Sequence, residues 1–264
     1  MIEFRSPQNE KLLSYIEGYY YLSEKNEKLP HYLTFPNNYT IVTFIKNGSV
    51  QQKGKIIYIT KSNGNSLLSV ITQYKSPLEI RYLEPVDEIT IYLKPGALAC
   101  IFPELINDSQ VKTVFDCDAQ FLKKEFNRIS NKEGNKDLDT EIEKFLANRI
   151  GRKIDGLLAE MIKRLNNNQT IGEISAELNL SRQYISNYFK DGIGKSPTEF
   201  RTISRFRKAI KNHAIDETLT KLTYENSFFD QAHFNKYFKL LTSYKPKDFF
   251  KQTQGNNKVV WLII

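Results

Sequence analysis

The chain carries the stretch SRQYISNYFK at residues 181–190 and a second version of it, DQAHFNKYFK, at residues 230–239. Each version begins at an N-cap residue, holds an apolar pair four positions apart, and is followed by a proline: Ser181 and Asp230, Ile185/Phe189 and Phe234/Phe238, Pro197 and Pro246. A phenylalanine follows each proline three positions later. A pattern repeated at a fixed distance indicates one supersecondary unit used twice.

A short helical pattern precedes each version. In residues 171–178, Ile171, Ile174 and Leu178 recur at helical spacing, and residues 219–225 precede the Asp230 cap in the same way. A helix, a tight turn and a capped second helix form the helix-turn-helix layout, whose second helix enters the major groove of DNA. A helical hairpin that packs against other helices is the alternative, and two copies with matching caps, cores and prolines favour the helix-turn-helix.

Residues from about 165 to 252 resemble the DNA-binding domain of the AraC/XylS family of bacterial transcription regulators. The resemblance rests on the linker stretch Arg205-Phe206-Arg207-Lys208-Ala209 and on Leu219, Leu222, Phe228, Asp230, Phe234, Lys236, Phe238, Lys239 and Pro246. Ser227 and Ser243 stand where the family usually has glycine, and Thr223 where it usually has alanine, which puts the turn geometry of the second unit in question. The resemblance implies two units joined by a linker helix, double-stranded DNA and RNA polymerase as partners, and a transcription activator.

The charge of the chain is uneven. Residues 1–150 hold 19 Lys and Arg against 19 Asp and Glu, whereas residues 151–264 hold 19 against 11, so the whole net charge of +8 lies in the second part. A basic half on a neutral half is typical of a nucleic-acid-binding module. A membrane-surface domain is the alternative, but no apolar run approaches the ~20 residues of a spanning helix. The sequence predicts a cytoplasmic protein with no membrane partner.

The first ~115 residues carry short strand patterns at 40–45, 55–60, 67–72, 78–82 and 88–93, the first of them running into Asn47-Gly48, a hairpin signal. Helical patterns follow at 97–102, 119–129 and 139–150. The predicted fold class is therefore α+β, with an N-terminal antiparallel barrel or sandwich of the cupin-like kind and a C-terminal all-α domain. The predicted domains are residues 1–150, a sensor or dimerisation domain; 151–252, the DNA-binding domain; and 253–264, an apolar tail.

The N-terminal part lacks the residues that catalysis or metal binding requires. His31 is the only histidine there, so a histidine-rich metal site is unavailable, and a hydrogen-bonded structural role is favoured for it. Cys100 and Cys117 do not have metal-like spacing and are expected to be buried thiols. No cofactor motif or catalytic set of residues is present. An aromatic pocket for an apolar effector is one interpretation, and plain core packing is the other; the residues are Tyr32, Phe35, Tyr39, Phe44, Tyr58 and Tyr82.

The polar face of each repeated helix predicts the DNA contacts. In the first helix they are Arg182, Gln183, Ser186 and Asn187, and in the second Gln231, Asn235 and Lys236. Glutamine and asparagine pair with adenine edges, and arginine pairs with guanine or phosphate. A solvated polar face is the alternative. A linker helix over residues 197–214 would hold the two helices about one DNA turn apart.

Two features remain open. The amphipathic patterns at 119–129 and 139–150 either cover the barrel or form the contacts of a homodimer. The terminal run VVWLII at 259–264 lies beyond the family's domain and predicts a strand added to an N-terminal sheet edge or packed between the domains, a frayed terminus being the alternative. The predicted function is a sequence-specific DNA-binding regulator; alternatives are a ligand-independent regulator whose N-terminal half binds only another protein and, more remotely, an enzyme or an RNA-binding adaptor.

Overall fold

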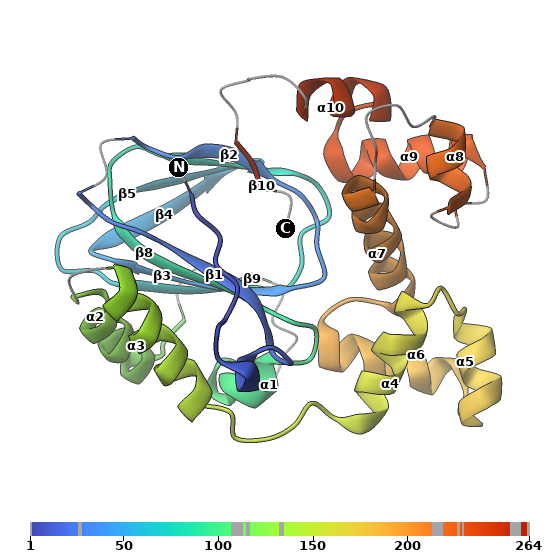
Figure 1. Ribbon diagram of the computed structural model, residues 1–264, viewed down its shortest axis with the longest axis horizontal. Coiled ribbons are helices and arrows are strands. Elements are labelled where there is room, and N and C mark those ends of the chain that lie inside the picture. The colour runs from blue at the N-terminus through green and yellow to red at the C-terminus, as the bar shows by residue number, and fades with distance from the viewer. Residues whose placement is uncertain are drawn as a thin grey trace.

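The computed structural model describes residues 2–25, 28–106, 113–114, 117–131, 135–212, 219–225, 228, 230–253 and 260–262. Figure 1 shows two β-sheets on one side of the molecule and a column of helices on the other, with α7 running between an upper and a lower helical group. The strands come first along the chain, except for a short strand near the C-terminus that lies against the sheets.

The strands form two five-stranded sheets in the described part of the chain. Sheet A has the order β1-β8-β3-β6-β9, and sheet B has the order β10-β2-β7-β5-β4. The bounds are β1 Ile16–Leu22, β2 His31–Thr34, β3 Thr40–Lys46, β4 Gly48–Lys53, β5 Ile56–Lys61, β6 Leu67–Ile71, β7 Leu78–Tyr82, β8 Asp87–Leu93, β9 Thr113–Val114 and β10 Val260–Leu262. Of the two predicted forms, the structure has the sandwich, with no closed barrel among the described strands.

Two details of the strand predictions are wrong. Two pairs of strands, β5 with β7 and β2 with β10, are parallel, so the sheets are not purely antiparallel. Asn47-Gly48 does not close a hairpin, because β3 pairs in sheet A and β4 pairs in sheet B. The chain turns a corner between the sheets instead: Asn47 has a φ of 47°, and a Cβ on Gly48 would lie 2.3 Å from the Ile45 Cγ2 atom. Glycine is required there by close packing.

Strand β8 shows how the sequence builds two cores from one strand. Ile89, Ile91 and Leu93 face the core beneath the helices, whereas Glu88 and Tyr92 lie on the opposite side, between the sheets. Successive side chains of a strand point to opposite faces, so one alternating sequence supplies both cores.

Three helices cover sheet A, as the helical patterns predicted. The bounds in this part are η1 Glu10–Leu12, α1 Leu98–Ile101, η2 Pro103–Leu105, α2 Gln120–Ser130 and α3 Asn135–Asn148. Phe126 of α2 stacks on Phe44 of β3, with ring centroids 5.4 Å apart. Cys100 and Cys117 are buried and form no disulfide, as predicted.

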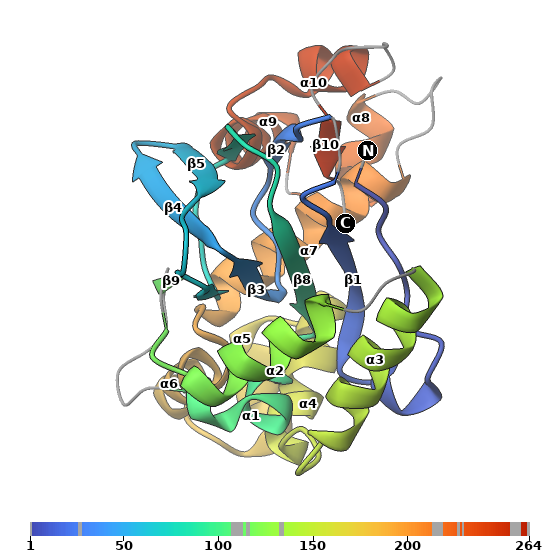
Figure 2. The ribbon, with the colours of Figure 1, turned by 90° about the vertical axis from the view of Figure 1, so that its left-hand side faces the viewer.

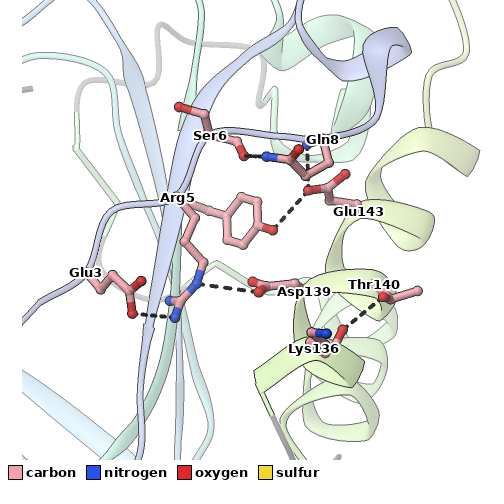
Figure 3. Close-up of polar contacts among 9 residues, drawn as sticks. Glu3, Arg5, Ser6, Gln8, Lys136, Asp139, Thr140 and Glu143 are labelled. Atoms are coloured by element: carbon pink, nitrogen blue, oxygen red, sulfur yellow. Dashed lines mark hydrogen bonds and ion pairs between the residues drawn. The ribbon is translucent and has the colours of Figure 1, made fainter.

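Helix α3 is fastened to the N-terminal segment by a buried carboxylate. The Glu143 carboxylate accepts hydrogen bonds from the backbone N–H groups of Gln8 (2.9 Å) and Asn9 (2.8 Å) and from the Tyr19 hydroxyl (3.1 Å). Arg5 lies 3.4 Å from Asp139, one turn earlier on α3. Figure 3 shows these contacts bringing the N-terminal segment and α3 together. Buried hydrogen-bonded carboxylates of this kind fix one arrangement of the elements they join.

The remaining helices form the second half of the chain. The bounds are α4 Gly156–Asn166, α5 Ile171–Leu178, α6 Arg182–Ile193, α7 Pro197–Asn212, α8 Leu219–Glu225, α9 Gln231–Thr242 and α10 Pro246–Thr253. Figure 2 shows α7 passing behind the sheets, with α8 to α10 near one end and α4 to α6 near the other. Every helix in the described residues is too short or too polar to cross a lipid bilayer.

The tail returns to the sandwich. Val260, Trp261 and Leu262 pair in parallel register with Tyr32, Leu33 and Thr34 of β2, at the edge of sheet B. The prediction of an added edge strand is confirmed for the backbone of these three residues. Strand β10 therefore joins residues 260–262 to a sheet of the N-terminal half.

Candidate nucleic-acid interface

The first helix-turn-helix unit consists of α5 and α6. Thr170 caps α5 in a reciprocal capping box with Glu173, and Asn179 ends the helix with a left-handed φ of 54°. Ser181 then caps α6 by accepting a hydrogen bond of 3.1 Å from the Tyr184 backbone N–H. Each cap satisfies backbone groups that a helix end leaves without partners. The predicted layout of two capped helices around a tight turn is confirmed here.

The second unit uses the same design. Asp230 caps α9 through a 2.6 Å hydrogen bond from the His233 backbone N–H, and Phe234 and Phe238 turn into the core. Ser243 ends α9 in the left-handed conformation, with a φ of 66°, where Gly194 ends α6 with a φ of 78°. The serine therefore adopts a left-handed backbone conformation that favours glycine. Ser227 lies outside the described residues.

The linker helix α7 begins where the sequence predicted. It begins at Pro197 and its described part ends at Asn212; the expected last two residues, 213 and 214, lie outside the described residues. Sixteen residues at about 1.5 Å each span about 24 Å. Figure 1 shows the two units at the two ends of this helix, on the side of the molecule away from the sheets.

The structure leaves the predicted DNA-contact residues on accessible helix faces. Six of the seven are exposed and Ser186 is half-buried; the exposed ones are Arg182, Gln183, Asn187, Gln231, Asn235 and Lys236. Gln183 donates a 2.9 Å hydrogen bond from Nε2 to the Asn187 Oδ1 atom, so these two amides lie side by side on α6. The Arg182 guanidinium lies close to Gly172 of α5, where a Cβ would come within 3.1 Å of it.

Sequence reasoning missed an exposed tyrosine on the first recognition helix. Tyr184 is 47% exposed and its ring stacks on that of Tyr188, with centroids 5.7 Å apart. The Tyr188 hydroxyl donates to the Asp155 carboxylate at 2.6 Å, and this hydrogen bond raises the pKa of Tyr188 to about 12. Asp155 is also the N-cap of α4, so the tyrosine pair is anchored to the helix beneath it. The signal in the sequence was an aromatic residue, Tyr184, directly before the core residue Ile185.

A basic hollow beside the second recognition helix was also missed. It runs from α9 to the start of α10 and has a volume of about 340 Å³; its lining residues are Asn235, Lys236, Lys239, Lys245, Pro246 and Lys247. Four ammonium groups around one concave surface favour the binding of phosphate oxygens. The signal in the sequence was the lysine clustering around Pro246, which only the turn between α9 and α10 brings next to Lys236.

The two halves of the chain meet through a half-buried arginine, a buried lysine and one phenylalanine. Arg207 of α7 donates hydrogen bonds to the backbone carbonyls of Phe35 (2.7 Å) and Pro36 (3.0 Å), directly after β2. Lys195, 2% exposed, reaches the Thr72 carbonyl, and burial lowers the pKa of its ammonium to about 8. Phe35 itself lies in the core of the second unit, 5.4 Å from Phe249 between ring centroids.

The six aromatic residues predicted to line one effector pocket do not lie together. Only Tyr32 and Tyr82 line the cavity between the sheets. Phe35 packs in the second helix-turn-helix unit, and Phe44 lies on the helix-covered face of sheet A. Tyr58 is half-buried beneath Lys53, and Tyr39 packs edge-on against Tyr92. Strand alternation and the corner after β2 send these side chains to different faces, which sequence spacing did not reveal.

The cavity that forms between the two sheets is lined by a buried carboxylic acid. It has a volume of about 60 Å³, and Glu88, 2% exposed, lies on its wall. The Glu88 carboxylate accepts hydrogen bonds from the Tyr20 hydroxyl (2.9 Å), the Tyr82 hydroxyl (2.7 Å) and the Thr90 hydroxyl (2.7 Å). Burial raises the pKa of Glu88, and the three hydroxyl donors oppose that rise. Elsewhere, His31 is hydrogen-bonded to Glu79 at 2.6 Å, as predicted, and no metal-binding cluster occurs within the described residues.

Comparisons with known proteins agree with this geometry. Residues 174–252 match the family model for a helix-turn-helix domain. This segment is an AraC-type DNA-binding domain. The match covers both units and α7.

The solved structures to which the chain is similar include structures of ToxT from Vibrio cholerae. One ToxT structure has 15% sequence identity and a TM-score of 0.44, covering 90% of this chain and 98% of ToxT. Another, of wild-type ToxT with an unsaturated fatty acid bound, has 14% identity and a TM-score of 0.42, covering 88% of this chain and 92% of that one. No curated protein sequence matches the chain.

Proposed function

We propose that the chain is a sequence-specific transcription activator whose two recognition helices enter successive major-groove segments of double-stranded DNA. The observation that carries the proposal is the pair of polar, exposed helix faces at the two ends of α7, each on a capped helix whose opposite face is core. Capped N-termini hold such helices in the orientation that groove contact requires.

The two helices have different chemistry. Arg182, Gln183, Ser186 and Asn187 offer the amide and guanidinium groups that read base edges. Gln231 and Asn235 offer amides, but Lys236 borders the basic hollow with Lys239, Lys245 and Lys247. A lysine gives a point charge rather than a two-pronged contact. The first helix is therefore assigned chiefly to base recognition, and the second chiefly to phosphate contact with weaker base recognition.

The N-terminal half is assigned to effector sensing or dimerisation. The proposed division is residues 1–150 for this role, 151–252 for DNA binding, and 253–264 for a tail that joins the two through β10. β2 supports the sensing role, since Tyr32 and Thr34 line the cavity and the following Phe35 packs in the second unit. RNA polymerase is the proposed partner in activation.

A regulator without a small-molecule effector is the second candidate. Phe121 of α2 is 62% exposed beside a polar hollow shared by α2 and α3, and a second copy of the chain or another protein would cover it. On this account the N-terminal half acts only through protein contacts, and occupancy of the cavity has no effect on DNA binding.

Selection of bound duplexes from a random DNA library tests the proposal. The selected sites should contain two short conserved blocks separated by about one helical turn. The Gln183→Ala variant should lose preference within one block only, and Asn235→Ala should affect the other more weakly. A library that yields no enriched sequence, while binding remains strong and salt-dependent, would refute sequence-specific recognition.

A further inference from the structure

The cavity between the two sheets contains a carboxylate that no cation faces. Among the described residues that line it, none is lysine, arginine or histidine, and Glu88 is the one carboxylic acid. Arg207, which donates to the backbone carbonyls of Phe35 and Pro36, is not among the lining residues. A buried carboxylate without a counter-ion is costly in free energy. A cation that enters this cavity would supply the counter-ion that the lining residues do not.

The hydrogen atoms around Glu88 are already assigned. Tyr20, Tyr82 and Thr90 each have one hydroxyl hydrogen, and in the ionised form of Glu88 each donates it to the carboxylate. It follows that Tyr32 donates in the 3.2 Å contact with Tyr20. Thr43 likewise donates in the 2.9 Å contact with Thr90.

The hydrogen bonds around Glu88 leave some hydrogen-bond acceptor positions unfilled. A carboxylate has about four acceptor positions, three of which are filled, and the Tyr82 oxygen keeps a lone pair as well. Around Glu88, an entering molecule is therefore met by hydrogen-bond acceptors, which favour N–H donors and disfavour anions. The Ser69 and Tyr92 hydroxyls, which also line the cavity, can donate as well as accept.

The aromatic walls and the small volume of the cavity further limit the class of molecule that it can bind. The rings of Tyr20 and Tyr92, with centroids 6.4 Å apart, stand beside the carboxylate, and aromatic faces attract cations. The cavity volume is about 60 Å³, well below the ~150 Å³ of a cavity that holds benzene. Since one water-sized group needs about 10–15 Å³, the cavity has room for roughly four non-hydrogen atoms.

We propose that the sandwich cavity binds a small organic cation rich in N–H groups, of the size of guanidinium, between the Glu88 carboxylate and the tyrosine rings. This site differs from the aromatic pocket for apolar ligands that the sequence suggested, since four of those six residues lie elsewhere. Its role as the effector site rests on the function proposed above; its ability to bind a cation does not.

Binding should also release a proton. Burial raises the pKa of Glu88, and the cation requires the ionised form. The titratable groups that face Glu88 are Tyr20 from β1, Tyr32 from β2, Tyr82 from β7 and Tyr92 from β8 itself. Burial raises the pKa of each phenol, so they stay neutral near pH 7. Affinity for the cation should therefore increase as pH rises through the pKa of Glu88.

Guanidinium and urea, which have the same shape but differ in charge, test the proposal on the full chain without DNA. Calorimetric titration at millimolar concentrations, far below those that unfold proteins, should show guanidinium binding about tenfold or more tighter than urea. Glu88→Gln keeps the shape of the side chain and should remove that preference; wild-type thermal stability of the variant shows that it is folded. The guanidinium–urea comparison in the wild type needs no variant.

Equal or absent heats for guanidinium and urea would overturn the proposal and leave the cavity as a site for water alone. Guanidinium binding that Glu88→Gln leaves unchanged would also overturn it, by placing the cation elsewhere. DNA affinity of the free chain, measured in parallel, is independent of both outcomes and tests the proposed function separately.

Discussion

The two helix-turn-helix units share a sequence pattern but differ in what completes their cores. The core of the first unit is formed entirely between Leu157 and Phe200. The core of the second contains Phe35, from the end of a strand in the N-terminal half. The first unit is thus complete within the C-terminal half, whereas the packing of the second depends on where β2 ends. A repeated sequence does not imply equal independence of the two copies.

This difference has a consequence for signalling. β2 lines the sandwich cavity with Tyr32 and Thr34, pairs with β10 on its free edge, and continues into the backbone carbonyls that hold Arg207. A shift of this one strand would move Phe35 within the second unit and leave the core of the first unchanged. The second unit is therefore the one that we expect the N-terminal half to reposition.

Phe35→Ala should produce the largest effect. Removing a fully buried phenylalanine costs about 3–5 kcal/mol of unfolding free energy. Hydrogen exchange should show lost protection in α9 and α10 while α4 to α6 keep theirs. Phe189→Ala, in the core of the first unit, is the matched control and should give the opposite pattern. Unchanged exchange in α9 and α10 of Phe35→Ala would mean that the two units are equally independent.

The second-largest effects are expected in DNA binding, where variants of the two units should behave differently. Gln183→Ala should cost about 1–3 kcal/mol on the best site and relax preference at one or two base pairs. Lys236→Ala should weaken binding to all sequences alike and reduce the salt dependence by about one unit, because its ammonium borders the lysine-lined hollow. Filter binding on matched and mismatched duplexes at several salt concentrations measures both. A sharp loss of discrimination at one base pair in Lys236→Ala would contradict the phosphate role.

The interface at the first unit should show in the pH dependence of stability. Burial lowers the pKa of Lys195 to about 8, so the unfolded chain binds more protons than the folded chain above that pH. The stability contribution is fully present above the unfolded pKa and is lost as pH falls through about 8. From about pH 7.5 to about pH 9.5, urea unfolding should show a gain of about 1–2 kcal/mol.

Lys195→Met should lose this gain because it carries no titrating group. Lys190→Met, at an exposed position of α6, is the matched control and should keep the wild-type gain. An unfolding free energy that rises equally in wild type and Lys195→Met would contradict the assignment to Lys195.

The two helix C-caps should give the smallest effects, of opposite sign. Ser243→Gly removes the steric penalty of a left-handed serine and should stabilise the protein by about 0.5–1 kcal/mol. Gly194→Ser introduces the same penalty in the first unit and should destabilise it by about 1 kcal/mol. Thermal unfolding of the two variants measures the pair; shifts of the same sign would show that the two caps are not equivalent.

The sequence predicted well wherever local chemistry decides the structure. Ser181 and Asp230 cap their helices because a side-chain oxygen there satisfies the first turn, and Ile185 and Phe234 face the core by helical periodicity. The strand patterns at 40–45, 67–72 and 88–93 became β3, β6 and β8 for the same reason. These are properties of neighbouring residues, so no knowledge of the fold was needed.

The sequence did not predict the features that depend on contacts between segments far apart in the chain. Asn47-Gly48 has the chemistry of a hairpin, yet packing of Gly48 against Ile45 sends the chain to the other sheet. Phe35 looked like a pocket residue because the docking of the second unit beside β2 is invisible in the sequence. Glu88 was passed over because its three hydroxyl partners come from β1, β7 and β8.

Hydroxyl-radical footprinting of the full chain on its best site, at one chain per duplex, shows whether a single chain contacts two major-groove segments. Two units at the ends of α7 should protect two major-groove segments about one helical turn apart on the same face of the DNA. Gln183→Ala should weaken protection at one segment before the other. Protection of a single segment by one chain, with the duplex saturated, would contradict the account.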